Sequence, residues 1–219
     1  MTRRYTVDAQ NPDPAIIAEA VALIREGSLV IVPTDTAYGL AGDPSNPEVV
    51  QRILDIKNRD DKPGMPLLVT SLNQARHLGR FASLARALAT QFWPGALTLI
   101  VPTQQPYPPG ILGPDNSLAL RMPKHAVPLQ ITDALQAPII GTSANKSHEP
   151  SPRTAAAANA QLGLVVDCIL DAGPTPLTED STILNCVTVP PKVLREGALP
   201  LTALRPWLHP KKPKSPNLP

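Results

Sequence analysis

The chain has 219 residues, of which 42% are hydrophobic and 17% are charged, so it can bury a substantial core and suits one domain with at most a short appendage. Its net charge of +2 is too small to identify a nucleic-acid-binding protein by itself. No apolar stretch is long enough to cross a bilayer, which excludes a membrane-spanning protein.

Helices and strands alternate along the chain, which predicts a layered α/β protein. In chain order, we expect helices at 14–26, 47–56, 71–79, 83–91, 128–136 and 154–162, and strands at 29–32, 67–69, 97–101, 118–122, 139–141, 166–170, 181–185 and 193–195. Asn46 and Pro47 form a typical beginning for the second helix. Because strand 118–122 follows strand 97–101 without a helix between them, we expect a mixed sheet.

We expect a single domain over residues 10–200. From about Pro206 the sequence is rich in proline and lysine, so residues 201–219 are expected to form a mobile tail. The N-terminal residues form no hydrophobic signal region, which favours a cytoplasmic protein. Cys168 and Cys186 lie in separate apolar runs without a CxxC pair, and we expect reduced thiols and no zinc site.

The run Val32-Pro-Thr-Asp-Thr-Ala-Tyr-Gly-Leu40 places polar side chains directly after an apolar strand. In α/β proteins, ligands bind at this end of a strand. An ordinary turn, in which Thr34 and Asp35 bond to their own backbone, explains the run equally well. In the binding interpretation Thr34 contacts the ligand, while Asp35 and Tyr38 shape the turn.

Three further polar clusters lie beside apolar segments. Lys57 and Arg59 either complement the dipole of the helix that they end or bind phosphate or carboxylate oxygens. Arg121 closes an apolar strand and either reaches solvent or clamps a carboxylate. Ser143 and Asn145 follow another short strand, where they bond only to backbone or bind a base, ribose or phosphate.

The common nucleotide motifs GxxxxGK[ST] and GxGxxG are absent from the sequence, as are HExxH and a nucleophile elbow. Cationic clusters without a dedicated nucleophile suit a reaction in which the enzyme positions and neutralises anionic reactants. Phosphate-containing substrates fit this pattern best, with Mg²⁺ brought by the nucleotide.

Seven motifs in the chain resemble, in order, those of the YrdC/TsaC family. The resemblance extends over residues 14–197 and implies a twisted mixed β-sheet flanked by helices around a basic cavity. It rests on Pro33-Thr-Asp-Thr-Ala-Tyr-Gly-Leu40, Lys57-x-Arg59 with Pro66-Leu67, Trp93-Pro-Gly-Ala-Leu-Thr98, Leu120-Arg-Met-Pro123, Thr142-Ser-Ala-Asn-Lys-Ser147, Asp180-Ser-Thr182 and Leu194-Arg-Glu-Gly197.

Members of that family are L-threonylcarbamoyladenylate synthases. The resemblance implies a reaction of L-threonine, bicarbonate and ATP that yields threonylcarbamoyl-AMP and pyrophosphate. A tRNA-threonylcarbamoyl transferase complex then uses the product to form N6-threonylcarbamoyladenosine in tRNA. Mg²⁺ would accompany ATP, and no metal site of the protein itself is implied.

The resemblance also implies roles for individual residues. Lys57 and Arg59 would offset the charge on the departing pyrophosphate. Threonine would be bound by Thr34, Arg121, Ser143 and Ser181, and ATP by Lys57, Arg59, Ser117, Asn145 and Arg195.

Two positions depart from the family pattern. His148 stands where the family usually has glycine; histidine tolerates a positive φ better than most residues but adds bulk. Thr70 stands where the longer members carry histidine. The chain therefore resembles the short form of the family, with a basic, proline-rich extension.

Two other functions are compatible with the sequence. In one, the basic cavity and the Lys211, Lys212 and Lys214 tail form a double-stranded RNA- or tRNA-binding module without turnover, whose affinity would fall steeply with salt. In the other, the chain is a carbamoyl-adenylate enzyme of hydrogenase maturation, although that role normally occurs in a much longer chain.

Overall fold

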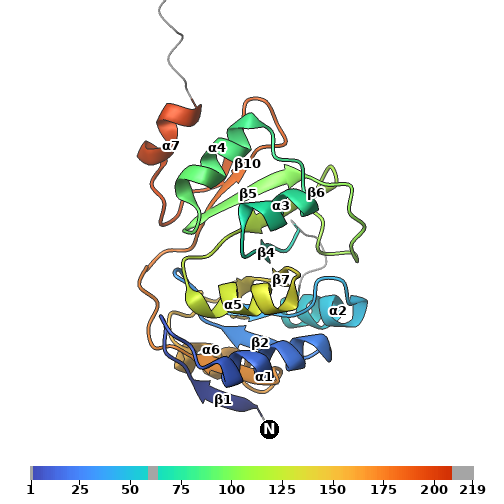
Figure 1. Ribbon diagram of the computed structural model, residues 1–219, viewed down its shortest axis with the longest axis vertical. Coiled ribbons are helices and arrows are strands. Elements are labelled where there is room, and N and C mark those ends of the chain that lie inside the picture. The colour runs from blue at the N-terminus through green and yellow to red at the C-terminus, as the bar shows by residue number, and fades with distance from the viewer. Residues whose placement is uncertain (1, 59–63, 209–219) are drawn as a thin grey trace, which may run out of the picture.

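The computed structural model describes residues 2–58 and 64–208, and its strands and helices alternate over most of that length (Figure 1). The strands are β1 (Arg3–Thr6), β2 (Val30–Val32), β3 (Gly39–Ala41), β4 (Leu67–Leu68), β5 (Leu97–Pro102), β6 (Ser117–Arg121), β7 (Ile139–Ile140), β8 (Thr142–Ser143), β9 (Cys168–Asp171), β10 (Thr182–Asn185) and β11 (Lys192–Arg195). The helices are α1 (Pro14–Arg25), α2 (Pro47–Ile56), α3 (Leu72–Leu78), α4 (Ser83–Phe92), α5 (Ala126–Leu135), α6 (Ala155–Leu162) and α7 (Leu201–Leu208).

The strands form two mixed sheets. The first sheet has the order β1-β9-β2-β3-β8 and lies in the lower half of Figure 1, where α1 and α6 pack against it. The second sheet has the order β11-β10-β5-β6-β4-β7 and lies in the upper half, where α4 packs on β5. Parallel and antiparallel pairs occur in both sheets. The predicted mixed α/β class is confirmed, but the strands are divided between two sheets.

Local sequence accounts for most element boundaries. The carboxylate of Asp13 accepts a hydrogen bond from the Ala15 amide at the start of α1, and the Asn46 side chain accepts one from the Glu48 amide at the start of α2. The apolar face of α1 is buried, including Ile17 and Ile24. The expected helices and strands agree with the structure to within a few residues.

The two sheets meet where β7 continues into β8. The single residue between these strands is Gly141, whose amide donates to Pro66 O at 2.8 Å. A Cβ atom added at Gly141 would lie 2.4 Å from Cγ of Leu68 on β4, so only glycine allows this close approach. The chain thus passes directly from the second sheet to the first.

The structured region extends beyond residues 10–200 at both ends. At the N-terminal end, β1 pairs in parallel with β9. At the other end, α7 occupies residues that were assigned to the tail, and Leu204 is fully buried in the core. The three lysines of the tail lie outside the described residues. Among the helices that are described, none is both long and apolar enough to cross a membrane.

Candidate functional site

A cavity of about 370 Å³ lies between the two sheets. The second sheet contributes one wall, and the segment after β2 together with β8 contributes the opposite one. The lining residues are Thr34, Thr36, Ala37, Tyr38, Gly39, Gly64, Pro66, Leu68, Thr98, Ile100, Ala119, Arg121, Gly141, Thr142, Ser143, Asp180, Ser181, Ile183, Leu194 and Arg195.

The strand register explains why distant residues share one wall. Ile183 of β10 lies beside Thr98 of β5, and Leu68 of β4 lies beside Arg121 of β6. Ala119 and Arg121 are two residues apart, so their side chains point to the same face of the sheet. The wall therefore combines apolar side chains with two guanidinium groups, those of Arg121 on β6 and Arg195 on β11.

Arg121 is buried and is held by three protein groups. Its Nε donates to Gly95 O at 3.0 Å, Nη1 to Thr36 Oγ1 at 2.7 Å, and Nη2 to Asp35 Oδ1 at 2.6 Å. Burial lowers the pKa of the guanidinium, while the carboxylates of Asp35 and Asp180 oppose that shift. The predicted cation is thus brought to the cavity, already paired with a buried carboxylate.

The predicted turn after β2 is present, and it uses the hydroxyl of Thr34. Thr34 Oγ1 donates to Ala37 O at 2.6 Å and accepts from the Thr36 and Ala37 amides at 3.1 Å each. The turn interpretation is therefore confirmed for Thr34; because Thr34 also lines the cavity, its contact with a ligand stays a prediction. Tyr38 points to a different partner, donating to Gly173 O at 2.6 Å, and burial raises its pKa to about 12.

Lys57 and Asn145 lie together at Ser143. The Lys57 ammonium is buried and donates to Ser143 O, to Asn145 O at 2.7 Å and to Asn145 Oδ1 at 2.6 Å. The Ser143 hydroxyl donates to Asn145 Oδ1 at 2.6 Å. The predicted cation and the predicted Ser/Asn turn therefore form one hydrogen-bonded unit at the cavity wall.

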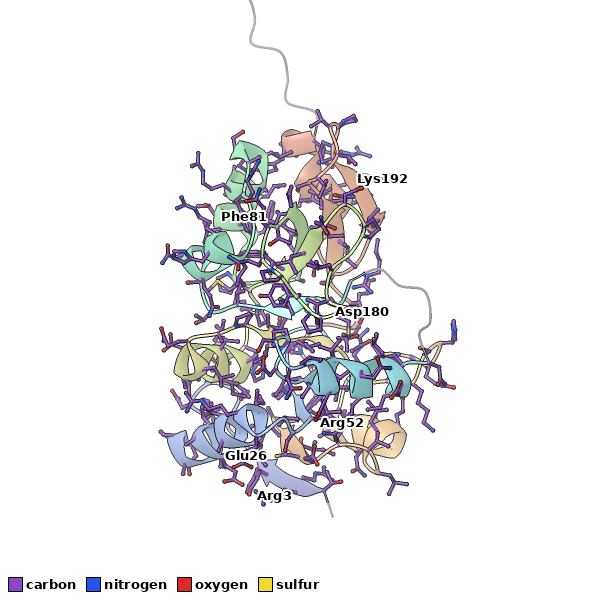
Figure 2. All side chains as sticks on the ribbon, turned by 90° about the vertical axis from the view of Figure 1, so that its right-hand side faces the viewer. Arg3, Glu26, Arg52, Phe81, Asp180 and Lys192 are labelled. Carbon is purple, nitrogen blue, oxygen red and sulfur yellow. The ribbon has the colours of Figure 1, made fainter. Side chains whose placement is uncertain are left out.

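Ser181 and Arg195 also meet at the cavity. The Ser181 hydroxyl lies 2.8 Å from that of Thr98 and accepts from Arg195 Nη2 at 3.3 Å, while Arg195 Nε donates to Ser181 O at 3.0 Å. Asp180 precedes Ser181, and Figure 2 shows it at mid-height, between the half with Phe81 and Lys192 and the half with Arg52. It forms ion pairs with Arg195 and with Arg153.

Three predicted residues, Lys57, Asn145 and Ser117, are not among the described residues that line the cavity, although Lys57 and Asn145 contact Ser143. Ser117 lies on β6 four residues before Arg121, and its hydroxyl donates to Pro114 O at 2.6 Å. Arg59 lies outside the described residues. The roles assigned to individual residues for threonine and ATP remain predictions.

The sequence did not predict the residues that form hydrogen bonds and ion pairs with the predicted site residues. Asp35 was expected to shape the turn, whereas it also pairs with Arg121 and accepts from the Lys124 amide at 3.0 Å. Arg153 was not singled out, because a lone arginine before a helix is typical of an exposed surface. Its guanidinium donates to the Thr36 carbonyl, 117 positions away in the chain. Asp180 belongs to the motif Asp180-Ser-Thr182, but the sequence predicted no binding or structural role for it.

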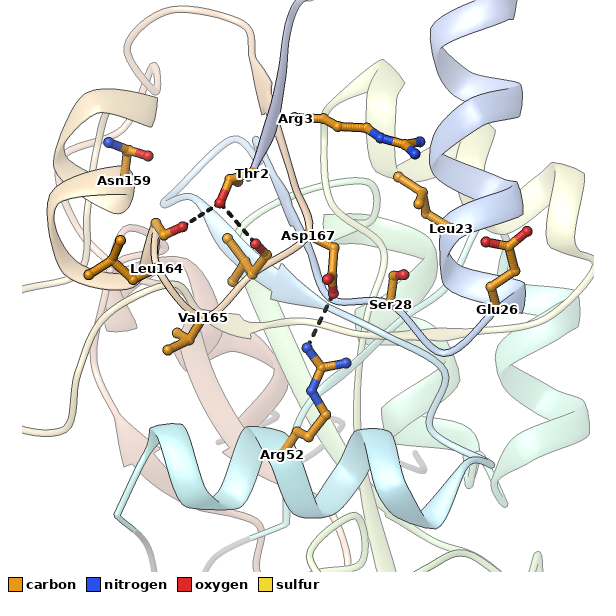
Figure 3. A pocket seen from close by; sticks show the side chains of 12 residues that line it. Thr2, Arg3, Leu23, Glu26, Ser28, Arg52, Asn159, Leu164, Val165 and Asp167 are labelled. Carbon is orange, nitrogen blue, oxygen red and sulfur yellow. Dashed lines mark hydrogen bonds and ion pairs between the residues drawn. The ribbon is translucent and has the colours of Figure 1, made fainter.

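A second cavity, of about 1030 Å³, lies between β1, the end of α6 and α2 (Figure 3). The ion pair between Arg52 and Asp167, with a separation of 3.2 Å, crosses it, and Thr2 donates to the nearby Val166 carbonyl. Its lining includes both charge signs and none of the predicted site residues. We therefore assign the candidate site to the cavity between the sheets.

The groups around the candidate site suit an anionic ligand. Arg121 and Arg195 line the cavity, with Lys57 at its wall, and its hydroxyls come from serine and threonine. Histidine and cysteine are absent from the described lining. No cluster of three or more metal-binding side chains was found over residues 2–58 and 64–208. The fold and site are typical of α/β proteins that bind small anionic substrates by charge and hydrogen bonding.

Comparison with known proteins places the chain in a family. Residues 22–197 match the Sua5/YciO/YrdC family model, which bears the description "Telomere recombination". The chain belongs to this family, as the sequence motifs predicted.

Named relatives cover most of the chain. It is 36% identical to threonylcarbamoyl-AMP synthase of Pyrococcus abyssi over 83% of its length and 35% identical to that of Bacillus subtilis over 90%. It spans only 54% and 59% of those two proteins. A putative threonylcarbamoyl-AMP synthase of Mycobacterium tuberculosis is 37% identical, with 88% of this chain and 89% of that protein covered.

Solved structures agree with the fold. P. abyssi Sua5 complexed with L-threonine superposes with a TM-score of 0.90 at 33% identity, covering 95% of this chain and 61% of the other. E. coli YciO has a TM-score of 0.83 at 22% identity, covering 90% and 97%, and supports the fold alone.

Proposed function

We propose that this chain is an L-threonylcarbamoyladenylate synthase. The observation that supports it most directly is the cavity in which Arg121, Ser143, Ser181 and Arg195 converge. Relatives at 35–36% identity are named threonylcarbamoyl-AMP synthases, and P. abyssi Sua5 has been solved with L-threonine. The product would supply a transferase complex that forms N6-threonylcarbamoyladenosine in tRNA, in the cytoplasm.

The proposed reaction has two bond-forming steps. The amine of L-threonine and bicarbonate form a carbamate with loss of water. A carbamate oxygen then attacks the α-phosphorus of ATP, the bond to the β-phosphate bridging oxygen breaks, and pyrophosphate leaves. Threonylcarbamoyl-AMP is the product, and no protein nucleophile takes part.

In this proposal the protein binds, orients and neutralises the reactants. Arg121 uses three of its five N–H donors within the protein, so donors remain for the threonine carboxylate. Ser143, Ser181 and Thr34 complete the threonine site. Lys57, Asn145 and Arg195, with Ser117 and Arg59, bind ATP and offset the charge that develops on pyrophosphate.

Mg²⁺ would arrive with ATP as part of the substrate. Among the described residues, the carboxylates at the cavity are already engaged by arginines, Asp35 by Arg121 and Asp180 by Arg153. This donor set does not favour a metal held by the protein alone, whereas phosphate oxygens are suitable Mg²⁺ ligands.

The deciding experiment incubates the purified chain with ATP, Mg²⁺, bicarbonate and labelled L-threonine. Threonine-dependent release of pyrophosphate, together with a labelled adenylate adduct, is the expected result. If pyrophosphate release does not depend on threonine, the proposal is wrong. Tight, salt-sensitive RNA binding without any ATP turnover would instead favour the RNA-binding module.

A further inference from the structure

The carboxylate of Asp180 lies between two arginines at the edge of the cavity. Its Oδ1 is 3.0 Å from Arg153 Nη2, and its Oδ2 is 3.5 Å from Arg195 Nη1. Ser151 donates a hydrogen bond of 2.9 Å to Oδ2. Oδ1 is buried and, among the described residues, accepts no hydrogen bond, so the ion pair with Arg153 is its main compensation.

Arg153 is fixed in place by the backbone around it. The carbonyl of Pro152 accepts from the Tyr38 amide at 2.9 Å, and the carbonyl of Arg153 accepts from the Thr175 amide at 2.8 Å. Its Nη1 donates to Thr36 O, while Nη2 faces Asp180. Arg153 does not line the cavity, whereas Asp180 and Arg195 do. Arg153 therefore neutralises the charge of the Asp180 carboxylate from the side that faces away from the cavity.

The three side chains carry two positive charges and one negative charge. Arg195 is the most exposed of them, with 44% of its side chain accessible against 29% for Asp180 and 30% for Arg153. A phosphate that enters the cavity would meet Arg195 and the Asp180 carboxylate together. Without Arg153, that carboxylate would repel the phosphate and compete with it for Arg195.

We infer that Arg153 is a positioning residue for nucleotide binding: it holds and neutralises Asp180, and so keeps Arg195 available to the phosphates of ATP. This inference rests on the proposed function, since it takes the cavity as the ATP site. Arg153 itself need not touch the substrate. Its effect is exerted through the charge and position of Asp180.

The test is a double-mutant cycle in the full-length chain, in which the charges of Arg153 and Asp180 are removed singly and together. Arg153→Gln removes the compensating charge, and we expect the Kd and KM for ATP to rise by about tenfold or more, with a smaller change in kcat. Arg153→Gln combined with Asp180→Asn restores the original net charge, and ATP affinity should return to within about threefold of wild type. Arg153→Lys keeps the charge and should retain most of the affinity.

Affinity is measured by titration calorimetry with ATP and with pyrophosphate at low and moderate salt, because screening should reduce the effect. Arg86→Gln, at an exposed position on α4, is the matched control and should bind as wild type does. If Arg153 only braces the Thr36 carbonyl, the double variant will stay as weak as Arg153→Gln, and that result overturns the inference. Wild-type affinity in Arg153→Gln overturns it as well.

The wild-type arm separates this inference from the proposed function. ATP binding without threonine-dependent pyrophosphate release would refute the synthase, while the affinities of the variants would still decide the role of Arg153. Failure of wild type to bind either ATP or pyrophosphate would overturn both. Should Arg153→Gln not fold, Asp180→Asn alone decides: unchanged or tighter ATP binding supports the inference, and a tenfold loss contradicts it.

Discussion

Arg121 and Asp35 are 86 positions apart in the chain and form a buried ion pair, with Nη2 and Oδ1 separated by 2.6 Å. Only 8% and 5% of their side chains are exposed. Asp35 belongs to the turn after β2, and Arg121 ends β6 in the second sheet. The pair thus joins the two walls of the candidate site.

Breaking this pair should destabilise the protein strongly. Asp35→Asn leaves the Arg121 guanidinium buried without its counter-charge, and we expect a loss of about 3–5 kcal/mol in the free energy of unfolding. Urea unfolding at pH 7 measures it. Asp35→Leu combined with Arg121→Met removes both charges and should recover part of the stability, yet abolish threonine-dependent turnover. A loss below about 1 kcal/mol in Asp35→Asn would show that the pair contributes little.

Replacement of Lys57 should affect activity and stability together. Lys57→Ala removes the donor that binds Ser143 O and both oxygens of Asn145. We expect threonine-dependent pyrophosphate release to fall by about 10²–10³-fold. The unsatisfied acceptors should also lower the free energy of unfolding by about 1–3 kcal/mol. If Lys57→Ala turns over at a rate close to wild type, Lys57 has no catalytic role.

Acid should weaken the start of α5. His125 Nδ1 accepts from the Val127 amide at 3.3 Å, which requires that nitrogen to be unprotonated. Burial lowers the pKa of His125, although Asp35 opposes the shift, so the unfolded chain takes up the proton first. The contribution of His125 is therefore complete above pH 6.5 and is lost as the pH falls through the lower, folded value.

The measurement compares denaturant unfolding between pH 7.5 and pH 5 in wild type and in His125→Asn. Asparagine can also cap the helix but does not titrate in this range. The variant should lose less stability on acidification than wild type does. His77→Asn, at an exposed histidine, serves as the control. Equal pH dependence in wild type and His125→Asn would contradict this prediction.

Replacing His148 with glycine, the usual residue of the family at this position, should stabilise the protein. The φ of His148 is +69°, in the left-handed region that costs a side-chain-bearing residue about 1–2 kcal/mol. His148→Gly removes that strain but increases the entropy of the unfolded chain, so we expect a net gain of about 0.5–1 kcal/mol. Thermal unfolding should show a Tm higher by about 1–4 °C. His148→Val, which cannot easily adopt this φ, should shift the Tm downward.

The two cysteines should react slowly in the folded protein. Burial raises the pKa of the Cys168 thiol to about 11 and that of the Cys186 thiol to about 12, so little thiolate is present at neutral pH. We expect reaction with a disulfide reagent to be about 10²-fold slower, or more, than in the denatured chain. A colorimetric thiol assay with and without denaturant measures both rates. Fast labelling of either cysteine in the native protein would be the opposite result.

Much of this architecture was predictable because strong local signals agree with the final fold. Asn46 and Pro47 mark the start of α2 by capping, and apolar runs mark β5 and β10. β1 was missed because its sequence, Arg-Arg-Tyr-Thr, shows no apolar alternation and depends on pairing with β9. The division into two sheets was not predicted, because the passage from β7 to β8 at Gly141 involves close packing against Leu68, which lies far away in the sequence.

The candidate site was likewise predictable only in part. Residues beside strand ends, such as Arg121 and Ser143, were predictable because position and chemistry coincide. Their partners were not, since the contact between Arg153 and Thr36 spans 117 positions and leaves no local pattern. Asp35 was visible in the sequence, but its pairing with Arg121 depends on bringing the two sheets together.

The location of the cavity between two sheets also governs how binding and folding are linked. Its walls come from segments scattered from Thr34 to Arg195, so the site depends on long-range contacts that form only in the native state. A ligand that occupies it binds the folded chain alone and raises the free energy of unfolding by about 2.7 kcal/mol at 100 times its Kd. The rise in the unfolding temperature with ligand concentration therefore measures occupancy of this cavity.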